Sequence, residues 1–473
     1  MFDKNLKGKR ALILGAGGSS GRAAALLARR LGARVILADD RKMGGLEELF
    51  TPEELDDDSG REGFLDARGE PESSLLSSYS PDFLLTAPGV PLASEVFRLA
   101  REAGRPVYGE NDFAYGALRA RGDDSFVAGV TGTDGKSTTV ALLAHLINEA
   151  SDCTAIPCGN YGLPLSRIAL ERENPPAKRA LIVECSSFQL EPTRFFHPEV
   201  AMILNLARDH QDRYESEEDY LRAKLRITEN QSPEDLLLLD PEVARRARNL
   251  PEGFHTPARA EIIDASSALP RAFGLDENAL ERFSLPGAHN RLNLLFALFG
   301  LARLVERRDA RVERDRLLAA LASFRGLPHR LEGAGETDGL VFVNDSKATT
   351  VQATLRALEA CLANDPIAVC VLLGGRDKGA DFSLLPRGER RLRYFPYGEA
   401  GPLIARALGD RNVLPDMKSA FQAATEAAET YGGEGRALVL LSPGCASFDE
   451  FSSYADRGAR FKELAREYLE RKR

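Results

Sequence analysis

The chain has 473 residues, more than one hydrophobic core usually serves, so we expect about two to four domains and take three as the working number. Hydrophobic residues make up 43% and charged residues 28%, the balance of a globular protein rather than a disordered one. The net charge of -9 argues against a nucleic-acid partner, because phosphate backbones are bound by surplus Lys and Arg. Acidic ligands must therefore be bound by local positive groups.

The first residues, MFDKNLKGKRALILGAGG, have no long apolar stretch between a basic start and a cleavage site. No run approaches the ~20 apolar residues that span a bilayer, so we expect a cytoplasmic protein without a membrane partner. The six cysteines form no CxxC pair and no metal-finger spacing, which indicates buried free thiols rather than disulfides or a zinc site. These cysteines are Cys153, Cys158, Cys185, Cys361, Cys370 and Cys445.

Apolar runs and helical spacing predict successive α/β units along the chain. In the first unit a strand enters the glycine turn GAGGSSG, a helix follows, and a second strand ends near Asp39, which begins a doubly wound sheet. The acidic, Gly/Ser-rich stretch from Met43 to Ser80 indicates a peripheral, partly mobile insertion. The predicted elements are strands Arg10 to Leu14, Arg34 to Leu37 and Asp82 to Thr86, and a helix Arg22 to Leu31.

The second unit has a strand, a glycine loop and a helix, followed by two apolar runs that end in polar groups. Such runs suit strands of a sheet that is covered on both faces, and ligands collect at the carboxyl ends of those strands. A third unit repeats the pattern, with the loops NDSKATT, GGRDKGADF and SPGCASFDEF after its strands. The predicted strands are Phe126 to Thr131, Ala180 to Val183, Val200 to Leu206, Leu340 to Val343, Ile367 to Leu373 and Ala437 to Leu441; the helices are Ser137 to Ala150 and Val351 to Leu362.

The segment GTDGKST lies between a predicted strand and a predicted helix, an arrangement that points backbone N–H groups and the positive helix end at an anion. Lys136 would add a positive charge for the outer phosphates of ATP, and the Ser137 hydroxyl a magnesium ligand. The common pattern GxxxxGK[ST] is not met, since residue 130 is Val. A simple chain turn is the alternative, and the strand and helix context favours an ATP loop formed by Gly132, Thr133, Asp134, Gly135, Lys136, Ser137 and Thr138.

Two polar residues at predicted strand ends are candidate metal ligands. Mg²⁺ prefers oxygen ligands, so Glu184 is a plausible partner for a metal that bridges the ATP phosphates, and His210 a ligand of a second metal. Each residue alone also fits an ordinary structural role at a strand end. Their joint position beside an ATP loop favours a function.

The glycine turn GAGGSSG resembles the GxGxxG dinucleotide fingerprint, but Ser20 stands where the last Gly is expected. Asp39 lies where an acidic residue would contact a ribose, so an NAD site is one interpretation. The same geometry binds any nucleotide diphosphate, because backbone amides recognise the pyrophosphate.

Ten segments in chain order resemble the Mur ligases of peptidoglycan synthesis, most closely their D-glutamate-adding members. Their order over nearly the whole chain is more specific than any single motif. GTxGK[ST] alone also fits the similar folylpolyglutamate synthetases. The segments are GTDGKST at 132, GNYGLP at 159, ECSSFQLE at 184, DHQDRY at 209, RAKLRI at 222, GAHNRLN at 287, GLPHR at 326, NDSKAT at 344, GGRDKGADF at 374 and SPGCASFDEF at 442.

The resemblance implies an α/β protein of three domains. These are an N-terminal Rossmann-like domain for the UDP-sugar over 1–116, a central P-loop ATPase domain over 117–326, and a C-terminal Rossmann-like domain for the amino acid over 327–473. It also implies a two-step reaction in a monomer. ATP phosphorylates the carboxylate of UDP-N-acetylmuramoyl-L-alanine, and D-glutamate attacks the acyl phosphate to give the amide, ADP and phosphate.

The resemblance further implies site residues in each domain. The ATP site would include Asn160, Asn290, Asn293, Arg330 and Asp345 besides the loop. D-glutamate, with two carboxylates, would meet cations and hydroxyls: Lys347, Thr349, Lys378 and Ser447, with Phe448 and Tyr454 as walls. The UDP end would meet Gly15, Gly17, Gly18, Ser19, Asp39, Arg41, Pro88 and Gly89.

Lys224 is a special case, because an ammonium group has three donors and no acceptor and so cannot bind Mg²⁺. From the residues alone it reads as a helix-surface lysine. By the resemblance it carries a carbamate formed with CO2, which makes it an oxygen ligand beside His210 in a two-magnesium site. Lys136, Glu184, His210 and Lys224 are then the catalytic residues.

The sequence departs from the family pattern at a few positions. Asp134 replaces the usual Asn or His and places a carboxylate near the phosphates. The glycine turn is one residue longer than usual. Thr350 replaces a common Asn and Gln211 an apolar residue. A related ligase that adds another amino acid, a folylpolyglutamate-type enzyme and, from another class, an NAD-linked protein or a non-catalytic nucleotide sensor remain the alternatives.

Overall fold

The structure is a computed structural model that forms two compact units, Met1–Phe324 and Arg325–Arg473, each described here by itself. The described residues are 5–39, 45–46, 49–51, 54, 63–171, 178–207, 213–264, 267, 269–283, 285, 287–337, 339–363, 365–377, 379–431 and 435–472.

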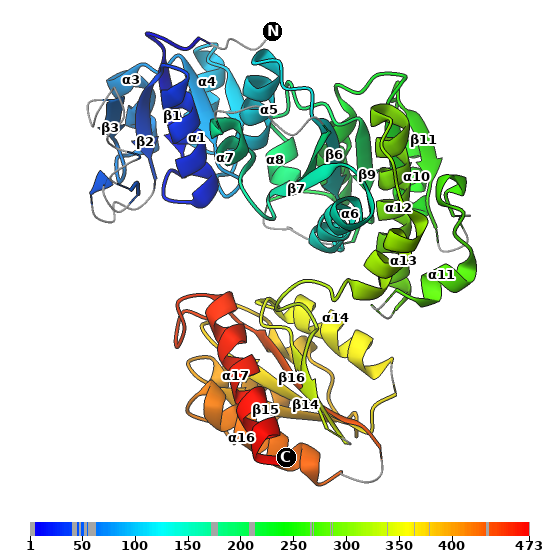
Figure 1. The fold of residues 1–473 in the computed structure, drawn as a ribbon. Coiled ribbons are helices and arrows are strands. Elements are labelled where there is room, and N and C mark those ends of the chain that lie inside the picture. Colours follow the sequence, from blue (N-terminus) through cyan, green and yellow to red (C-terminus); the bar gives the residue numbers. More distant parts are fainter. Residues whose placement is uncertain are drawn as a thin grey trace. The chain divides into compact units, whose positions relative to one another are not determined.

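The first unit begins with a five-stranded parallel sheet in the order β3-β2-β1-β4-β5 (Figure 1). Successive strand residues alternate between two cores: Ile13 packs with α1 and α5, whereas Leu12 packs with α3 and α4. The chain order reverses between β1 and β4, which is where doubly wound sheets bind ligands. The elements are β1 Arg10–Leu14, α1 Ser19–Arg30, β2 Arg34–Ala38, β3 Phe64–Asp66, α3 Glu72–Tyr79, β4 Phe83–Thr86, α4 Glu95–Glu102, β5 Val107–Gly109 and α5 Glu110–Ala120.

The expectation of a peripheral insertion from Met43 to Ser80 is wrong for its described part. Phe64 and Leu65 pair with β2 as the edge strand β3, and Leu75 of α3 is buried against the sheet. The acidic and serine-rich composition reflects the exposed side of this edge, while a few apolar residues suffice to attach it.

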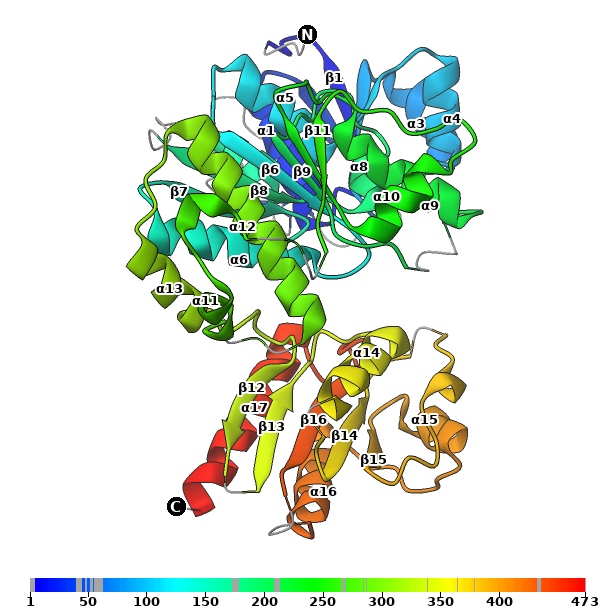
Figure 2. The same cartoon turned by 90° about the vertical axis from the view of Figure 1, so that its right-hand side faces the viewer.

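A second parallel sheet of the same unit has the order β11-β10-β9-β6-β8-β7. Apolar strands are covered on one side by α6, α12 and α13 and on the other by α5, α7, α9 and α10 (Figure 2). The elements are β6 Phe126–Thr131, α6 Lys136–Ala150, β7 Thr154–Gly159, α7 Leu165–Leu170, β8 Arg179–Glu184, α8 Ser187–Leu190, β9 Val200–Ile203, α9 Glu217–Leu225, η3 Arg226–Thr228, β10 Leu236–Leu239, α10 Pro241–Arg248, β11 Arg259–Ile262, η4 Arg271–Phe273, α11 Glu277–Glu281, α12 Ala288–Arg308 and α13 Arg314–Ser323.

Helix α5 joins the two sheets of the first unit, because one continuous core runs from α1 and α5 into α7 and the second sheet. At the start of α5, one carboxylate oxygen of Asp112 accepts hydrogen bonds from the backbone N–H groups of Arg194, Phe195 and Phe196 at 2.6–2.9 Å. The fully buried Glu110 accepts a 2.6 Å bond from the Ser166 N–H. The two sheets therefore share both apolar packing and buried polar contacts.

The second unit contains one sheet in the order β12-β13-β16-β14-β15, parallel except for the edge strand β12. Helices α16 and α17 cover one face and α14 and α15 the other. The elements are β12 Glu332–Glu336, β13 Leu340–Asn344, α14 Val351–Leu362, β14 Ala368–Gly374, η5 Phe382–Leu384, β15 Leu392–Tyr397, α15 Gly401–Leu408, α16 Met417–Glu429, β16 Ala437–Gly444 and α17 Tyr454–Lys472.

The predicted α/β class is confirmed, with three largely parallel sheets in the predicted chain order. The predicted boundaries at residues 116 and 326 stay predictions. All six cysteines are buried free thiols, as expected. Among the described helices, none combines the length and the apolar character that crossing a bilayer requires.

Candidate active site

The loop between β6 and α6 depends on two glycines in conformations that other residues rarely adopt. Gly132 has φ +148° and Gly135 has φ +80°. A Cβ atom on Gly132 would lie 3.2 Å from the Leu204 Cβ, and one on Gly135 would lie 2.5 Å from the Asn293 Oδ1. Both positions therefore need glycine for backbone conformation and for close approach to neighbouring segments.

Asn205, which follows β9, fixes the shape of this loop. Its Oδ1 accepts hydrogen bonds from the N–H groups of Thr133 (3.0 Å) and Asp134 (2.8 Å), and its Nδ2 donates to the Asp134 carbonyl (3.0 Å). The Thr133 hydroxyl accepts a 3.0 Å bond from the Ala207 N–H. Because the first loop amides are engaged in this way, the amides that follow at Gly135 to Thr138 are the ones placed for an anion.

Two long helices begin beside the loop and run in the same direction. The Gly135 position lies against Asn293 and, further along, Gly300 of α12 lies against Leu143 of α6. Neither helix has a side-chain hydrogen bond at its N-cap. Asn290, one of the predicted ATP-site residues, is in the first turn of α12. The positive ends of both helix dipoles thus coincide at the loop, which favours a polyphosphate there.

Lys136 is folded back onto the loop and donates hydrogen bonds to the carbonyls of Gly132 (3.0 Å) and Thr133 (2.7 Å). Ser137 is buried in the first turn of α6, and Thr138 follows it half-exposed. An ammonium group and a hydroxyl therefore lie at the N-terminal end of α6.

Glu184 is the last residue of β8, next to β6 in the sheet, and only 2% of it is exposed. Its Oε1 accepts a 2.8 Å hydrogen bond from the Asn160 Nδ2, whereas its buried Oε2 has no hydrogen-bond partner among the described residues. An oxygen of this kind suits a divalent cation. No three His, Cys, Asp or Glu side chains form a metal-binding group in the described part of the chain.

Lys224 lies on α9 with only 1% of its surface exposed, and it is not a helix-surface residue. Its Nζ donates a 2.8 Å hydrogen bond to the Gly132 carbonyl and lies 4.2 Å from the centre of the Tyr220 ring. The Tyr220 hydroxyl is in turn 3.5 Å from that of Thr133. The structure thus brings Lys224 to the loop, while His210 lies outside the described residues.

Asp134, the departure from the family pattern, is half-buried in the loop and close enough to His289 to affect its titration. Partial burial lowers the pKa of His289, and the Asp134 carboxylate opposes this shift. The carboxylate therefore interacts with the start of α12.

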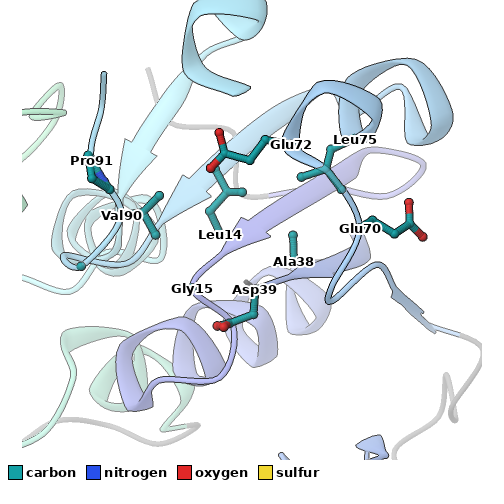
Figure 3. A pocket seen from close by; sticks show the side chains of 10 residues that line it. Leu14, Gly15, Ala38, Asp39, Glu70, Glu72, Leu75, Val90 and Pro91 are labelled. Atoms are coloured by element: carbon teal, nitrogen blue, oxygen red, sulfur yellow. The ribbon is translucent and has the colours of Figure 1, made fainter. Parts of the chain in front are cut away.

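A pocket opens at the carboxyl ends of β1, β2 and β4, where the strand order of the first sheet reverses. Figure 3 shows Leu14 and Ala38 at the strand ends between Val90 and Pro91 on one side and Glu70 on the other. Three carboxylates belong to its lining and no Lys or Arg does among the described residues. The lining residues are Leu14, Gly15, Ala38, Asp39, Glu70, Glu72, Leu75, Gly89, Val90 and Pro91.

The glycine turn at this pocket is held by Asp39, whose Oδ2 accepts a 2.9 Å hydrogen bond from the Gly17 N–H. A Cβ on Gly21 would lie 2.2 Å from the Gly15 carbonyl oxygen, so this position requires glycine. Of the predicted UDP-binding residues, Gly15, Asp39 and Gly89 line the pocket. Gly17, Gly18, Ser19 and Pro88 belong to the adjoining turns, and Arg41 lies outside the described residues.

In the second unit, Asp345 follows β13 and is buried, with its Oδ2 accepting from the Ser442 hydroxyl (2.9 Å) and its Oδ1 from the Leu331 N–H (3.2 Å). Burial raises the pKa of Asp345 to about 7, and these hydrogen bonds act in the opposite direction. His329 and Leu331 both have positive φ, so the GLPHR segment turns sharply and leaves Arg330 exposed.

Of the predicted D-glutamate residues, Lys347 and Thr349 follow β13, Ser447 and Phe448 follow β16, and Tyr454 is the first residue of α17. The Lys347 Nζ lies 5.3 Å from the centre of the Tyr454 ring. Thr349 is half-buried and Ser447 buried, whereas Phe448 and Tyr454 are exposed aromatic residues. Lys378 lies outside the described residues.

One buried side chain, Arg457, connects these loops through hydrogen bonds. It is fully buried, and its guanidinium donates to Ser346 Oγ (3.0 Å) and to backbone carbonyls at 3.0–3.4 Å. The loops after β13, β14 and β16 are thereby joined through one side chain. These acceptors are the carbonyls of Ser346, Gly374, Cys445 and Ala446.

Sequence reasoning missed Asn205, Tyr220 and Arg457. Asn205 and Arg457 carry no local signal, because their partners are far away in the chain. The spacing of Tyr220 and Lys224, four residues apart on one helix, was a usable signal, since such residues share a helix face.

Comparison with known proteins agrees with this arrangement. Solved structures share the fold: a MurF ligase from Thermotoga maritima in complex with ADP has a TM-score of 0.51 at 16% identity, covering 100% of this chain and 98% of that one. The UDP-N-acetylmuramate-alanine ligase of the same organism has a TM-score of 0.50 at 18% identity, covering 97% and 99%. The three-sheet α/β fold of this chain is therefore similar to the fold of these ligases.

The Mur ligase middle domain matches residues 130–300. The UDP-N-acetylmuramoylalanine–D-glutamate ligase of Anaeromyxobacter dehalogenans is 36% identical over 99% of both chains. The ligases of the same name from Pelotomaculum thermopropionicum (34%, 98% of both chains) and Myxococcus xanthus (35%, 97% of this chain and 98% of that one) are similarly related. The chain therefore belongs to the Mur ligase family, in the group of UDP-N-acetylmuramoylalanine–D-glutamate ligases.

Proposed function

We propose that this protein is an ATP-dependent ligase that joins D-glutamate to UDP-N-acetylmuramoyl-L-alanine through an acyl phosphate, in peptidoglycan precursor synthesis. The relationship to ligases of that name over nearly the whole chain supports the substrates. The observation that carries the chemistry is the convergence of the buried Glu184 and Lys224 on a glycine loop at the start of α6. An NAD-binding or folylpolyglutamate-type function has no comparable support.

The reaction brings two anions together, the substrate carboxylate and the γ-phosphate, so the protein must position them and neutralise their charge. The amides at Gly135 to Thr138 and the ends of α6 and α12 would hold the phosphates. Lys136 would leave its two carbonyl partners and follow the transferred phosphoryl group. Asn160, Asn290, Asn293, Arg330 and Asp345 are assigned to the nucleotide.

Magnesium fits the residues present, because the Glu184 Oε2 is buried without a hydrogen-bond partner in the described part of the chain, and Ser137 supplies a buried hydroxyl in the first turn of α6. Bound Mg²⁺ would neutralise phosphate charge. Ser137, Glu184, His210 and the carbamate of Lys224 are the residues assigned to two such ions. Addition of CO2 to the Lys224 amine, with loss of the ammonium protons, would replace a buried ammonium group with an anionic carbamate whose oxygens can bind a metal.

The pocket at β1, β2 and β4 is assigned to the uridine end of the substrate. Its carboxylates suit ribose hydroxyls and the base N–H, while the positive N-terminal end of α1, which begins at Ser19, suits the diphosphate. Asp39 holds the turn at this pocket, because its Oδ2 accepts the hydrogen bond from the Gly17 amide.

D-glutamate is assigned to the second unit. Its two carboxylates would be bound by Lys347, Lys378, Thr349 and Ser447, with Phe448 and Tyr454 alongside. The amine must be neutral to attack the acyl phosphate, and the aromatic walls would exclude water from that intermediate.

The test is phosphate release by the purified protein with UDP-N-acetylmuramoyl-L-alanine, ATP, Mg²⁺ and D-glutamate. We expect release that requires D-glutamate and is lost in Lys136→Ala. Absence of D-glutamate-dependent release, or equal release with L-lysine or diaminopimelate, would contradict the proposal.

A further inference from the structure

The motif DHQDRY contains Arg213 and Tyr214, which the proposed reaction leaves without a role. Arg213 is nearly buried, with 11% of its side chain exposed, and forms a two-pronged ion pair with Glu191: Nε to Oε1 at 3.2 Å and Nη2 to Oε2 at 2.7 Å. Glu191 follows α8, the short helix that begins just after Glu184. The pair therefore joins the segment after His210 to the segment after Glu184.

The same guanidinium reaches the first sheet. Its Nη1 lies 3.4 Å from the carbonyl oxygen of Pro88, in the turn between β4 and the UDP-side pocket. Its Cζ lies 3.9 Å from the centre of the Phe188 ring, and this contact fixes the plane of the guanidinium group. Arg213 thus contacts the turn after β4 of the first sheet and the α8 segment after β8 of the second sheet.

Aromatic contacts continue from this pair to the glycine loop. The Tyr214 hydroxyl donates a 2.5 Å hydrogen bond to Glu191, and its ring stacks on Phe188 at 6.0 Å. Tyr214 is 5.2 Å from Tyr220, measured between ring centres, and Tyr220 contacts Thr133 and Lys224. Packed side chains therefore run without a break from the pocket turn at Pro88 to the phosphate loop.

We propose that Arg213 is a positioning residue for the UDP-linked substrate. Its pair with Glu191 sets the spacing between the turn that holds the uridine end and the loop where the carboxylate is phosphorylated. This inference rests on the proposed function, because that substrate must reach from one sheet to the other. Binding energy from the remote nucleotide is then used to place the reacting carboxylate.

The test measures how Arg213→Ala changes the affinity for UDP alone and the KM for the complete UDP-linked substrate. We expect the affinity for UDP, measured by calorimetry, to stay within about threefold of the parent, while the KM for UDP-N-acetylmuramoyl-L-alanine rises at least about tenfold. The KM for ATP should change by less than about threefold. Arg213→Lys should resemble Arg213→Ala, because an ammonium group cannot form the two-pronged pair.

Arg245→Ala is the matched control, since Arg245 forms a two-pronged pair with Glu242 on the exposed side of α10, at 2.6 and 2.7 Å. It should leave all three constants unchanged. In a double-mutant cycle, Glu191→Gln should add little to Arg213→Ala.

Equal weakening of UDP and complete substrate would show that Arg213 binds the nucleotide or supports the fold, and would overturn the inference. Unchanged constants would overturn it too, as would full recovery by Arg213→Lys. If the parent protein releases no phosphate with D-glutamate, the proposed function fails instead. Calorimetry with UDP and with the complete substrate then still tests whether Arg213 acts only on the longer ligand.

Discussion

The Lys224 Nζ donates a 2.8 Å hydrogen bond to the carbonyl oxygen of Gly132, the first residue of the phosphate loop. The two residues are 92 positions apart in the chain. As an ammonium group, Lys224 donates to this loop carbonyl; once carbamylated, it would instead add an anionic oxygen beside the phosphates.

If Lys224 carries a carbamate, the rate of phosphate release should fall at least about 100-fold in Lys224→Ala, and acetate should restore part of it. Acetate can occupy the vacated space and supply the missing oxygen ligand. The measurement is phosphate release over a range of acetate concentrations, with chloride at equal ionic strength as the control. A variant as active as the parent would show that no carbamate is needed.

Glu184→Gln tests whether the buried carboxylate serves a metal. We expect phosphate release to fall at least about 100-fold, because the amide is a poor magnesium ligand. The Tm should stay within about 2 °C of the parent, since the charge has one hydrogen bond, from Asn160, and its removal relieves desolvation. If both the phosphate release and the Tm fall, with the Tm lowered by more than about 5 °C, Glu184 has a structural role.

Asp134→Asn restores the residue that the family commonly carries in the loop. Removing a carboxylate a few ångströms from the phosphates should lower the KM for ATP by about fivefold, which corresponds to about 1 kcal/mol. Steady-state kinetics with ATP varied provide the measurement. Asp124→Asn, the same charge change at an exposed position just before β6, should have no effect. A higher KM for ATP in Asp134→Asn would show that the carboxylate assists binding, for example through the metal.

The raised pKa of the buried Glu110 carboxyl should make the stability of the protein depend on pH. Burial raises the pKa of Glu110 to about 7 from 4.5. The folded protein therefore binds more protons than the unfolded one between these values, so its stability falls as pH rises from 4.5 through 7. Glu110→Gln keeps an acceptor for the Ser166 N–H and removes the charge, so it should gain up to about 3 kcal/mol at pH 8 and nothing below pH 4.5. Chemical denaturation at both pH values measures this, and equal gains at both would contradict it.

Arg457→Lys tests the connection between the three loops of the second unit. Lysine keeps the charge but has three donors and no planar fork, so most of the carbonyl contacts are lost. We expect the KM for D-glutamate to rise at least about tenfold, with a smaller change in the KM for ATP. Arg460→Ala, one turn further along α17 and only partly buried, is the control. Equal changes in both KM values would show that Arg457 supports the unit as a whole.

The strands and helices were largely predictable, because apolar runs and helical spacing are local properties. Phe126 to Thr131 and Val351 to Leu362 have the predicted bounds. Helix α1 begins at Ser19 rather than Arg22, since the glycine turn leads directly into the first helical turn. The edge strand β3 was missed because its three residues give too short a pattern for the period of a strand to show.

Individual contacts of the site were not predictable from local pattern. The motifs placed Lys136, Glu184 and Lys224 at the loop, and the residue types indicated phosphate and metal. What fixes their geometry is long-range: Asn205 on the loop, Tyr220 against Lys224, and Arg457 behind the amino-acid loops. Such contacts depend on how β-strands and helices pack together, which no single segment specifies.

The hydrogen bonds of Asn205 have a consequence for how fast and how tightly a nucleotide binds. Because these bonds already hold Thr133 and Asp134 in one backbone conformation, association should require little further loss of backbone entropy. Nucleotide should therefore enter at a rate limited by encounter and by the release of Lys136, and Asn205→Ala would slow association more than it speeds dissociation.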